Sequence, residues 1–242
     1  RMRGSPVLRT HTVLLSALTH GCDAARAALQ AQLQVRGFGL VRVDNARAAK
    51  GLDASLARFG ATDAFRFPPF TADGELGPTW PFSYRRAVVT LLHAAASCYD
   101  ALAPPLHAAS AAPPPRYRFP TSFVNWFNYA HGHLGAHTDR CLVTVVWATR
   151  DPPSAARLWV RPAGQLRWRD VDTVRARADE LVVFTGQDMQ RLTHGALAPV
   201  EHCVQRSDGG QPAEDGGVAA GGGGVPRLSA ALVLSAPLDA TG

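Results

Sequence analysis

Three side chains that can bind a metal are spaced in this sequence so that an antiparallel β-sheet would bring them together. His137 and Asp139 lie two positions apart, and residues two apart on a β-strand point to the same face of a sheet. His202 lies far downstream in the alternating segment 199–204, where it fits a strand that folds back beside the first. The spacing therefore predicts a sheet-rich core with a metal site at one strand end.

The ligand types favour iron, although two other assignments stay open. Two imidazoles and one carboxylate can occupy one face of an iron(II) ion and leave the opposite face open. His194 competes with His202, but it precedes a glycine in a predicted turn. His131 and His133 could join His137 in a three-histidine zinc site. That alternative would leave the nearby carboxylate without a role.

Further strands are indicated around these residues. Segments 141–147 and 180–184 are rich in β-branched and aromatic residues, as expected of strands buried on both faces, and the metal ligands would lie at the mouth of the first. Arg227 and Ser229 share one face of a later strand. A buried guanidinium needs a carboxylate partner, which a ligand could supply; an exposed structural arginine is the alternative.

The order of these motifs resembles the iron(II)- and 2-oxoglutarate-dependent oxygenases of the isopenicillin N synthase-like family. The resemblance covers residues 121–236. It also includes Asn128-Tyr129, similar to an Asn-Tyr element of the family, and a predicted hairpin at 164–168. The matching motifs are His137-Thr-Asp139, Phe184-Thr-Gly186, Leu192-Thr-His-Gly195, His202 and Arg227-Leu-Ser229.

The resemblance implies an α+β fold with a jelly-roll core, or double-stranded β-helix, at 121–242. Residues 1–120 would form a helical support with the first strands, packed outside the core as part of one structural unit. A Gly-rich, acid-containing insertion at 207–224 departs from the family pattern; because closure entropy grows slowly with loop length, the flanking strands can still pair. Gln187 stands where an acidic residue is common.

The activity implied by the resemblance is oxidation of a C–H bond in a small organic substrate by dioxygen, with release of succinate and carbon dioxide. Two alternatives are an iron oxidase of the same family that does not use 2-oxoglutarate, and a catalytically silent jelly-roll binding module. The implied iron(II) ligands are His137, Asp139 and His202, and the implied 2-oxoglutarate-binding residues are Arg227, Ser229, Tyr129 and Asn128.

The first half of the chain has helical patterns. A helix is predicted from Asp23, as its N-cap, to Val35, with Gly37 as its stop. Segment 38–43 alternates as a strand, and a second helix is predicted over 46–59. The longest helical pattern runs from Ser83 to the prolines at 104–105 and presents one apolar face, which we expect to pack on the outside of the barrel.

Composition argues against other classes of partner. The net charge of +6 comes from scattered arginines, and Lys50 is the only lysine, so a nucleic-acid-binding stripe is not indicated. Four cysteines without paired or zinc-knuckle spacing favour a reducing compartment. No apolar run approaches the roughly 20 residues of a membrane span. We therefore expect an intracellular, cytoplasmic protein that acts on a small molecule; an organellar location and the oligomeric state stay open.

Overall fold

Two β-sheets and a group of helices make up the part of the chain that the structure describes. The computed structural model describes residues 12–59, 65–67, 82–103, 121–129, 133–149, 156–206, 212 and 227–235. Its helices are α1 (Leu15–Thr19), α2 (Asp23–Arg36), α3 (Ala46–Phe59), α4 (Phe82–Leu102), α6 (Val171–Val174) and α7 (Gln187–Leu192). Its strands are β1 (Val13–Leu14), β2 (Gly39–Arg42), β3 (Phe65–Phe67), β4 (Phe123–Asn128), β5 (Leu134–His137), β6 (Val143–Ala148), β7 (Ala156–Arg161), β8 (Arg169–Asp170), β9 (Glu180–Thr185), β10 (Glu201–Arg206) and β11 (Leu228–Leu234).

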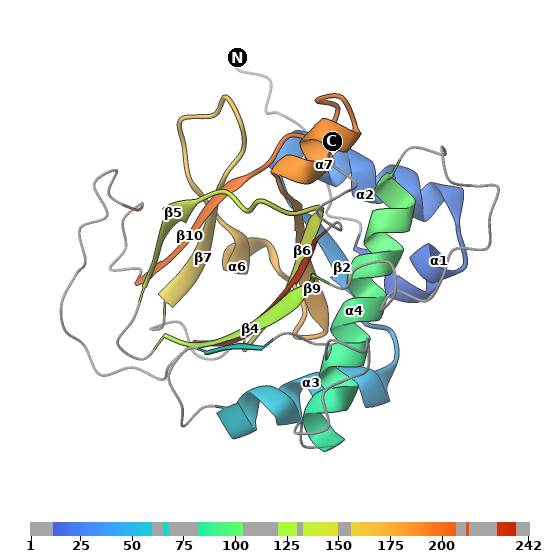
Figure 1. The fold of residues 1–242 in the computed structure, drawn as a ribbon, viewed down its shortest axis with the longest axis vertical. Helices are drawn as coiled ribbons and strands as arrows, with labels where there is room; N and C mark the ends of the chain where they lie inside the picture. The colour runs from blue at the N-terminus through green and yellow to red at the C-terminus, as the bar shows by residue number, and fades with distance from the viewer. Residues whose placement is uncertain are drawn as a thin grey trace, which may run out of the picture.

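The strands form a larger and a smaller sheet. The seven-stranded sheet has the order β1-β2-β9-β6-β11-β4-β3, and the four-stranded sheet has the order β5-β10-β7-β8. Neighbouring strands are antiparallel, apart from the parallel pair β1 and β2. Helices α2, α3 and α4 lie against one side of the larger sheet, and the smaller sheet lies on its other side (Figure 1). The predicted mixture of helices and antiparallel sheets is therefore confirmed.

The larger sheet is buried on both faces, which explains why its central strands lack polar alternation. On β6, Val143, Val145 and Trp147 belong to the core shared with the helices, while Val146 belongs to the core between the two sheets. Strand β9 divides its residues in the same way. Because both faces exclude water, strands 141–147 and 180–184 appear in the sequence as continuous apolar runs; the observed strands lie at 143–148 and 180–185.

The N-terminal helices follow their local sequence signals closely. Helix α2 ends at Gly37, which adopts a left-handed conformation with φ 78°, as a helix C-terminal glycine commonly does. Helices α3 and α4 match the predicted segments to within a residue or two. The N-cap prediction was wrong by one residue: Asp23 is the first helical residue, and Cys22 precedes it without a side-chain cap. A carboxylate in the first turn still stabilises the helix through its macrodipole.

The predicted pairing of the two histidine-bearing strands is confirmed. Strand β10 runs antiparallel to β5, with His202 directly opposite His137. The structure corrects the expected position of Asp139, which lies beyond the end of β5 in the segment leading to β6. Strand β5 belongs to the smaller sheet and β6 to the larger. Asp139 therefore lies where the chain crosses from the smaller sheet to the larger one. His137 belongs to the smaller sheet, not to the sheet that contains the predicted 141–147 strand.

Some sequence predictions fall on residues that the structure leaves undescribed. These are His131, the prolines at 104–105, and the 207–224 insertion apart from Pro212. Among the helices of the described ranges, none is both long enough and apolar enough to cross a membrane.

Candidate metal and cosubstrate site

The three predicted metal ligands converge in space. One donor atom each from His137, Asp139 and His202 can be chosen so that all lie within 4.8 Å of one another. The Nε2 atom of His137 lies 3.6 Å from Oδ1 of Asp139, and Nε2 of His202 lies 3.9 Å from Oδ2. The two imidazole rings have centroids 4.2 Å apart. Two nitrogens and a carboxylate thus point at one common volume.

Each imidazole is oriented by its second nitrogen. The Nδ1 atom of His137 lies 2.7 Å from the carbonyl oxygen of Gly135, and Nδ1 of His202 lies 3.3 Å from that of Val200. A carbonyl can only accept, so Nδ1 carries the proton and Nε2 presents its lone pair to the common volume. Burial lowers the pKa of His202. It therefore favours the neutral ring, which is the form that binds metal ions.

Asp139 is held by the larger sheet. The Thr144 hydroxyl donates a hydrogen bond of 2.6 Å to Oδ2 of Asp139, and the backbone N–H of Gln187 donates to the Asp139 carbonyl at 2.9 Å. Gly186 lies so close to this segment that an added Cβ would approach the carbonyl oxygens of Cys141 and Asp139 to 2.5 and 2.7 Å. The turn between β9 and α7 thus supports the Asp139 segment, and this close approach requires glycine.

Gly186→Ala is therefore expected to displace the Asp139 segment and to lower both stability and metal affinity. Inserting a methyl group against backbone costs about 1–3 kcal/mol, so the melting temperature should fall by roughly 2–12 °C. Differential scanning calorimetry and an iron titration would measure the two effects. Gly51→Ala, within α3, is the matched control, because an added Cβ would meet no atom of the described residues within 4 Å. It should stabilise by about 0.5–1 kcal/mol; equal effects of the two substitutions would contradict the prediction.

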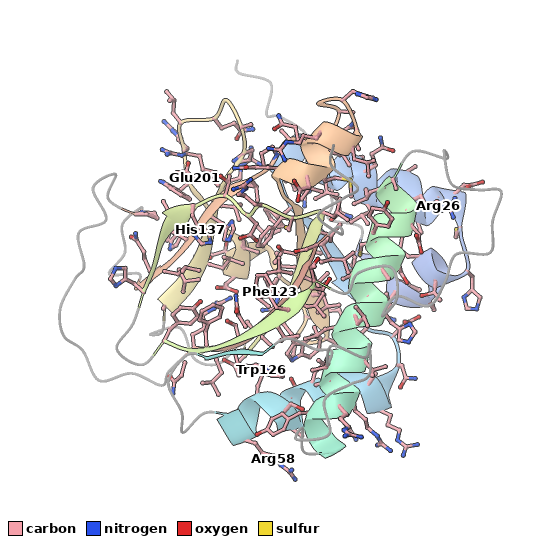
Figure 2. All side chains as sticks on the ribbon, in the orientation of Figure 1. Arg26, Arg58, Phe123, Trp126, His137 and Glu201 are labelled. Carbon is pink, nitrogen blue, oxygen red and sulfur yellow. The ribbon has the colours of Figure 1, made fainter. Side chains whose placement is uncertain are left out.

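The metal-binding cluster opens into a pocket between the two sheets. The cavity measures about 410 Å³, within the range typical of small-molecule sites. Figure 2 shows His137 and Phe123 lying between the sheets, with Trp126 on the helix side of β4. The lining residues are Phe123, Asn125, Phe127, Tyr129, Leu134, His137, Asp139, Thr144, Val146, Leu158, Phe184, His202, Val204, Arg227, Ser229, Ala231 and Val233.

Arg227, Ser229 and Tyr129 lie together in this pocket. Arg227 and Ser229 are 4% and 3% exposed. Arg227, which directly precedes β11, and Ser229 on β11 both line the cavity, while Ala230 and Leu232 face the helices. Tyr129 is hydrogen-bonded to Ser229, and burial raises the pKa of Tyr129 to about 12. The phenol therefore stays protonated at neutral pH and can donate a hydrogen bond.

The structure does not support the prediction that Asn128 contacts a cofactor. Asn128 is absent from the pocket lining, whereas Asn125, Phe127 and Tyr129 belong to it. Because side chains alternate along a strand, residues 125, 127 and 129 share the pocket face and residue 128 faces the other side. The Asn-Tyr resemblance thus brings only its tyrosine to the site.

Sequence reasoning missed two charged residues beside Arg227. The Nη1 group of Arg227 donates to Asp172 on α6, and buried Arg175 lies 3.7 Å from the same carboxylate. Arg227 therefore already has a carboxylate partner within the protein. No local pattern links Asp172 to a residue 55 positions away, because this contact depends on how the two sheets are stacked. The Nε atom of Arg227 is buried and has no hydrogen-bond partner among the described residues.

The two sheets and their helices form a fold that is shared with proteins solved with alpha-KG or 2-oxoglutarate and with a putative 2OG-Fe(II) oxygenase family protein from Caulobacter crescentus. A full-length Neurospora crassa protein, solved with alpha-KG and 5-formyluracil, is 12% identical over 93% of this chain and 84% of its own, with a TM-score of 0.60. A C-terminally truncated apo form of the Neurospora crassa protein is 14% identical over 97% of this chain and 99% of its own, also with a TM-score of 0.60.

AtDAO1, a dioxygenase for auxin oxidation from Arabidopsis thaliana solved with 2-oxoglutarate, is 14% identical over 94% of this chain and 93% of its own, with a TM-score of 0.52. No protein-family model and no curated protein matches the sequence. At these identities the likeness establishes the fold. The narrower isopenicillin N synthase-like assignment stays a prediction.

Proposed function

We propose that the protein is an iron(II)- and 2-oxoglutarate-dependent dioxygenase that oxidises a C–H bond of a small organic substrate and releases succinate and carbon dioxide. The observation that carries this proposal is the position of His137, Asp139 and His202 in the same cavity as Arg227. We infer a jelly-roll arrangement for the two facing sheets, which is supported by their largely antiparallel strands and by the cavity between them.

The donor set fits iron(II). Two neutral imidazoles and one carboxylate form a facial set of three ligands that leaves other coordination positions open. Hydrogen bonds to Gly135, Val200 and Thr144 fix the orientation of the three ligands, as the surroundings of metal sites generally do. His137 and Asp139 are partly exposed, so a metal ion can reach the cluster.

The part of the cavity that Arg227 lines fits the second carboxylate of 2-oxoglutarate. The buried Nε donor of Arg227 has no partner within the described ranges, and a buried donor without a partner is unfavourable until a ligand pairs with it. The hydroxyls of Ser229 and Tyr129 lie beside the guanidinium. Together they offer charge-assisted and neutral hydrogen bonds to a carboxylate.

The chain's own part in the reaction is binding, orientation and exclusion of water. Phe184, Val146 and Leu158 line the cavity with apolar surface, which keeps the reacting volume dry. Iron(II) and 2-oxoglutarate, when bound, would supply the oxidation of a C–H bond by dioxygen coupled to decarboxylation of the oxo acid. The similar Neurospora crassa protein was solved with 5-formyluracil and with thymine; ligands of that size fit our proposal of a small organic substrate.

A second candidate reaction uses the same metal cluster without 2-oxoglutarate. The observation that favours it is the ion pair between Arg227 and Asp172, because the guanidinium already has a carboxylate partner within the protein. The two candidates differ in one product, since succinate forms only when 2-oxoglutarate is consumed.

The test is an anaerobic titration of the purified protein with iron(II) and then 2-oxoglutarate. The proposal expects a weak visible charge-transfer band that requires both additions, and succinate formation once dioxygen and a substrate are supplied. Iron binding without this band would favour the second candidate. A folded protein that binds no iron would contradict both candidates and favour a silent binding module.

Thr144→Val is expected to weaken iron binding by about 10–100-fold, the usual effect of removing a hydrogen bond that orients a metal ligand. The valine keeps the shape of threonine but removes the hydroxyl that donates to Asp139. Thr185→Val is a matched control, because Thr185 is equally buried but donates to the Ala198 carbonyl. An iron titration of both variants measures the effect; equal affinities would show that the Thr144 hydrogen bond does not orient the ligand.

A further inference from the structure

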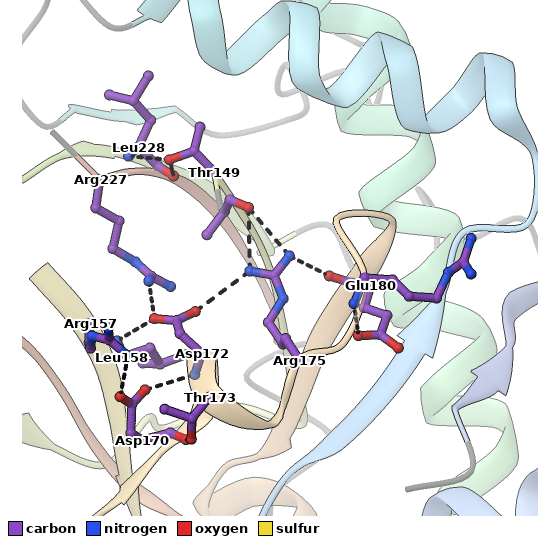
Figure 3. Close-up of polar contacts among 12 residues, drawn as sticks. Thr149, Arg157, Leu158, Asp170, Asp172, Thr173, Arg175, Glu180, Arg227 and Leu228 are labelled. Carbon is purple, nitrogen blue, oxygen red and sulfur yellow. Dashed lines mark hydrogen bonds and ion pairs between the residues drawn. The ribbon is translucent and has the colours of Figure 1, made fainter. Parts of the chain in front are cut away.

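Arg227 belongs to a cluster of charged residues that lies behind the pocket. Its carboxylate partner, Asp172, lies on α6 and also faces Arg175 (Figure 3). Arg227 lines the cavity, whereas Asp172 and Arg175 do not. Asp172 therefore lies on the side of the guanidinium away from the proposed ligand.

Asp172 is fixed from several directions. Its backbone N–H donates to Oδ1 of Asp170 at 2.9 Å, and its own Oδ2 accepts from the backbone N–H of Leu158 at 3.1 Å. Asp170 is paired with Arg157 at 2.7 Å. These contacts anchor α6 to β7, so the Asp172 carboxylate is a fixed point to which the flexible side chain of Arg227 is attached.

Arg175 supports the far side of the same carboxylate. Its guanidinium donates to the carbonyl oxygen of Glu180 at 2.9 Å and to that of Ala148 at 3.4 Å. Burial raises the pKa of Asp172, but the guanidiniums of Arg227 and Arg175 outweigh this effect and hold the pKa below its usual range. Asp172 is therefore ionised at neutral pH. Two arginines and one aspartate leave one positive charge in this group, which one further carboxylate would neutralise.

We propose that Asp172 is a positioning residue that holds Arg227 in the orientation needed to bind the second carboxylate of a 2-oxo dicarboxylic acid. It would thereby set the preference of the pocket for that class of cosubstrate. The inference rests on the proposed function. A long arginine side chain has several rotatable bonds; without the hydrogen bond at Nη1, the guanidinium would occupy several orientations beside the cavity.

Two substitutions of Asp172 separate its hydrogen bond from its charge. Asp172→Ala removes both. Asp172→Asn removes the charge but keeps an oxygen, and the donors of Arg227 and Leu158 point at the same atom, Oδ2. The amide oxygen can serve both donors while the amide nitrogen faces Arg175. If the hydrogen bond positions Arg227, Asp172→Asn should retain the binding preference for 2-oxoglutarate that Asp172→Ala loses.

The measurement is calorimetric binding of 2-oxoglutarate and of 2-oxopentanoate, which lacks the second carboxylate, to the full chain loaded with manganese(II) under anaerobic conditions. We expect the wild type to prefer 2-oxoglutarate by about 10–150-fold, the range for charge-assisted hydrogen bonds to one group. Asp172→Ala should lose most of this preference, because it should weaken the binding of 2-oxoglutarate and leave the binding of 2-oxopentanoate unchanged. Asp172→Asn should keep the preference or increase it.

Asp179→Asn is the matched control. It also removes a carboxylate that is paired with an arginine, but Asp179 pairs with Arg177, lies outside the pocket lining and, within the described part of the chain, forms no ion pair or hydrogen bond with Arg227 or Asp172. Its binding preference should equal that of the wild type. If Asp172→Ala does not fold, Asp172→Glu takes its place in the test. Glutamate keeps the charge but moves the carboxylate, so a positioning role predicts loss of the preference for 2-oxoglutarate.

The outcomes distinguish this inference from the proposed function. An unchanged preference in Asp172→Ala, or in Asp172→Glu where alanine does not fold, would overturn the positioning role while leaving the cosubstrate intact. Tighter binding of 2-oxoglutarate to Asp172→Ala would overturn it as well, because Asp172 would then be a competitor for Arg227. A wild type that binds both oxo acids equally would contradict the proposed cosubstrate itself.

Discussion

His202→Ala is expected to lower iron affinity by more than about 100-fold and to bring C–H oxidation below detection. Changes in residues that merely orient ligands cost about 10–100-fold, and this substitution removes a ligand of the proposed set. His202 is 5% exposed and opposite His137 in the sheet, so neighbouring side chains cannot easily replace its nitrogen. Iron binding by calorimetry and substrate-dependent succinate formation would measure the two losses.

His133→Ala is the control for this experiment. His133 is exposed and lies outside the pocket lining, so its loss should leave iron affinity within about twofold, in line with the small effects of most surface substitutions. The three-histidine zinc alternative predicts the opposite result. Loss of metal binding in His133→Ala, with binding retained in His202→Ala, would contradict the His137, Asp139 and His202 site.

Arg227→Met should weaken 2-oxoglutarate binding by about 10–150-fold, because one or more charge-assisted hydrogen bonds of about 1.5–3 kcal/mol are lost. Iron affinity should change little, since Arg227 is not among the clustered metal-binding groups. The substitution also leaves Asp172 with Arg175 as its remaining arginine partner, so we expect a lower melting temperature as well. The KM for 2-oxoglutarate, measured with iron affinity and thermal unfolding, separates these effects.

Arg227→Lys separates the charge of Arg227 from its hydrogen-bond geometry in the same experiment. Lysine keeps the positive charge but lacks the planar fork that can hold two carboxylate groups at once. Lysine should therefore preserve stability better than methionine while restoring little of the 2-oxoglutarate affinity. An Arg227→Met protein with unchanged 2-oxoglutarate binding would remove the cosubstrate assignment of this residue.

The elements that could be predicted are those with local causes. Helix α2 stops at Gly37 because glycine adopts the left-handed conformation that ends the helix more readily than other residues do. Strands β6 and β9 of the larger sheet could be recognised because burial on both faces leaves an apolar run. The placement of Arg227 and Ser229 on one face follows from the two-residue period of a strand, and both residues line the pocket.

Other features have causes that are remote in the chain. Asp139 appeared to continue the strand of His137, but β5 ends at His137 and the chain crosses to the other sheet. Asn128 matched a motif, yet its strand face turns it away from the cavity. Neither outcome follows from residue type, because each depends on which face of a strand meets the second sheet.

The sequence by itself determined the element types, the residues that share a strand face and the set of groups able to bind a metal, because these depend on propensity and on the period of side chains along the chain. Only the tertiary structure decided that Asp172 pairs with Arg227 and Arg175, and that Gly186 packs against the backbone of the Asp139 segment. These contacts join residues distant in sequence, and they exist only once the two sheets and the turns between them are packed at close range.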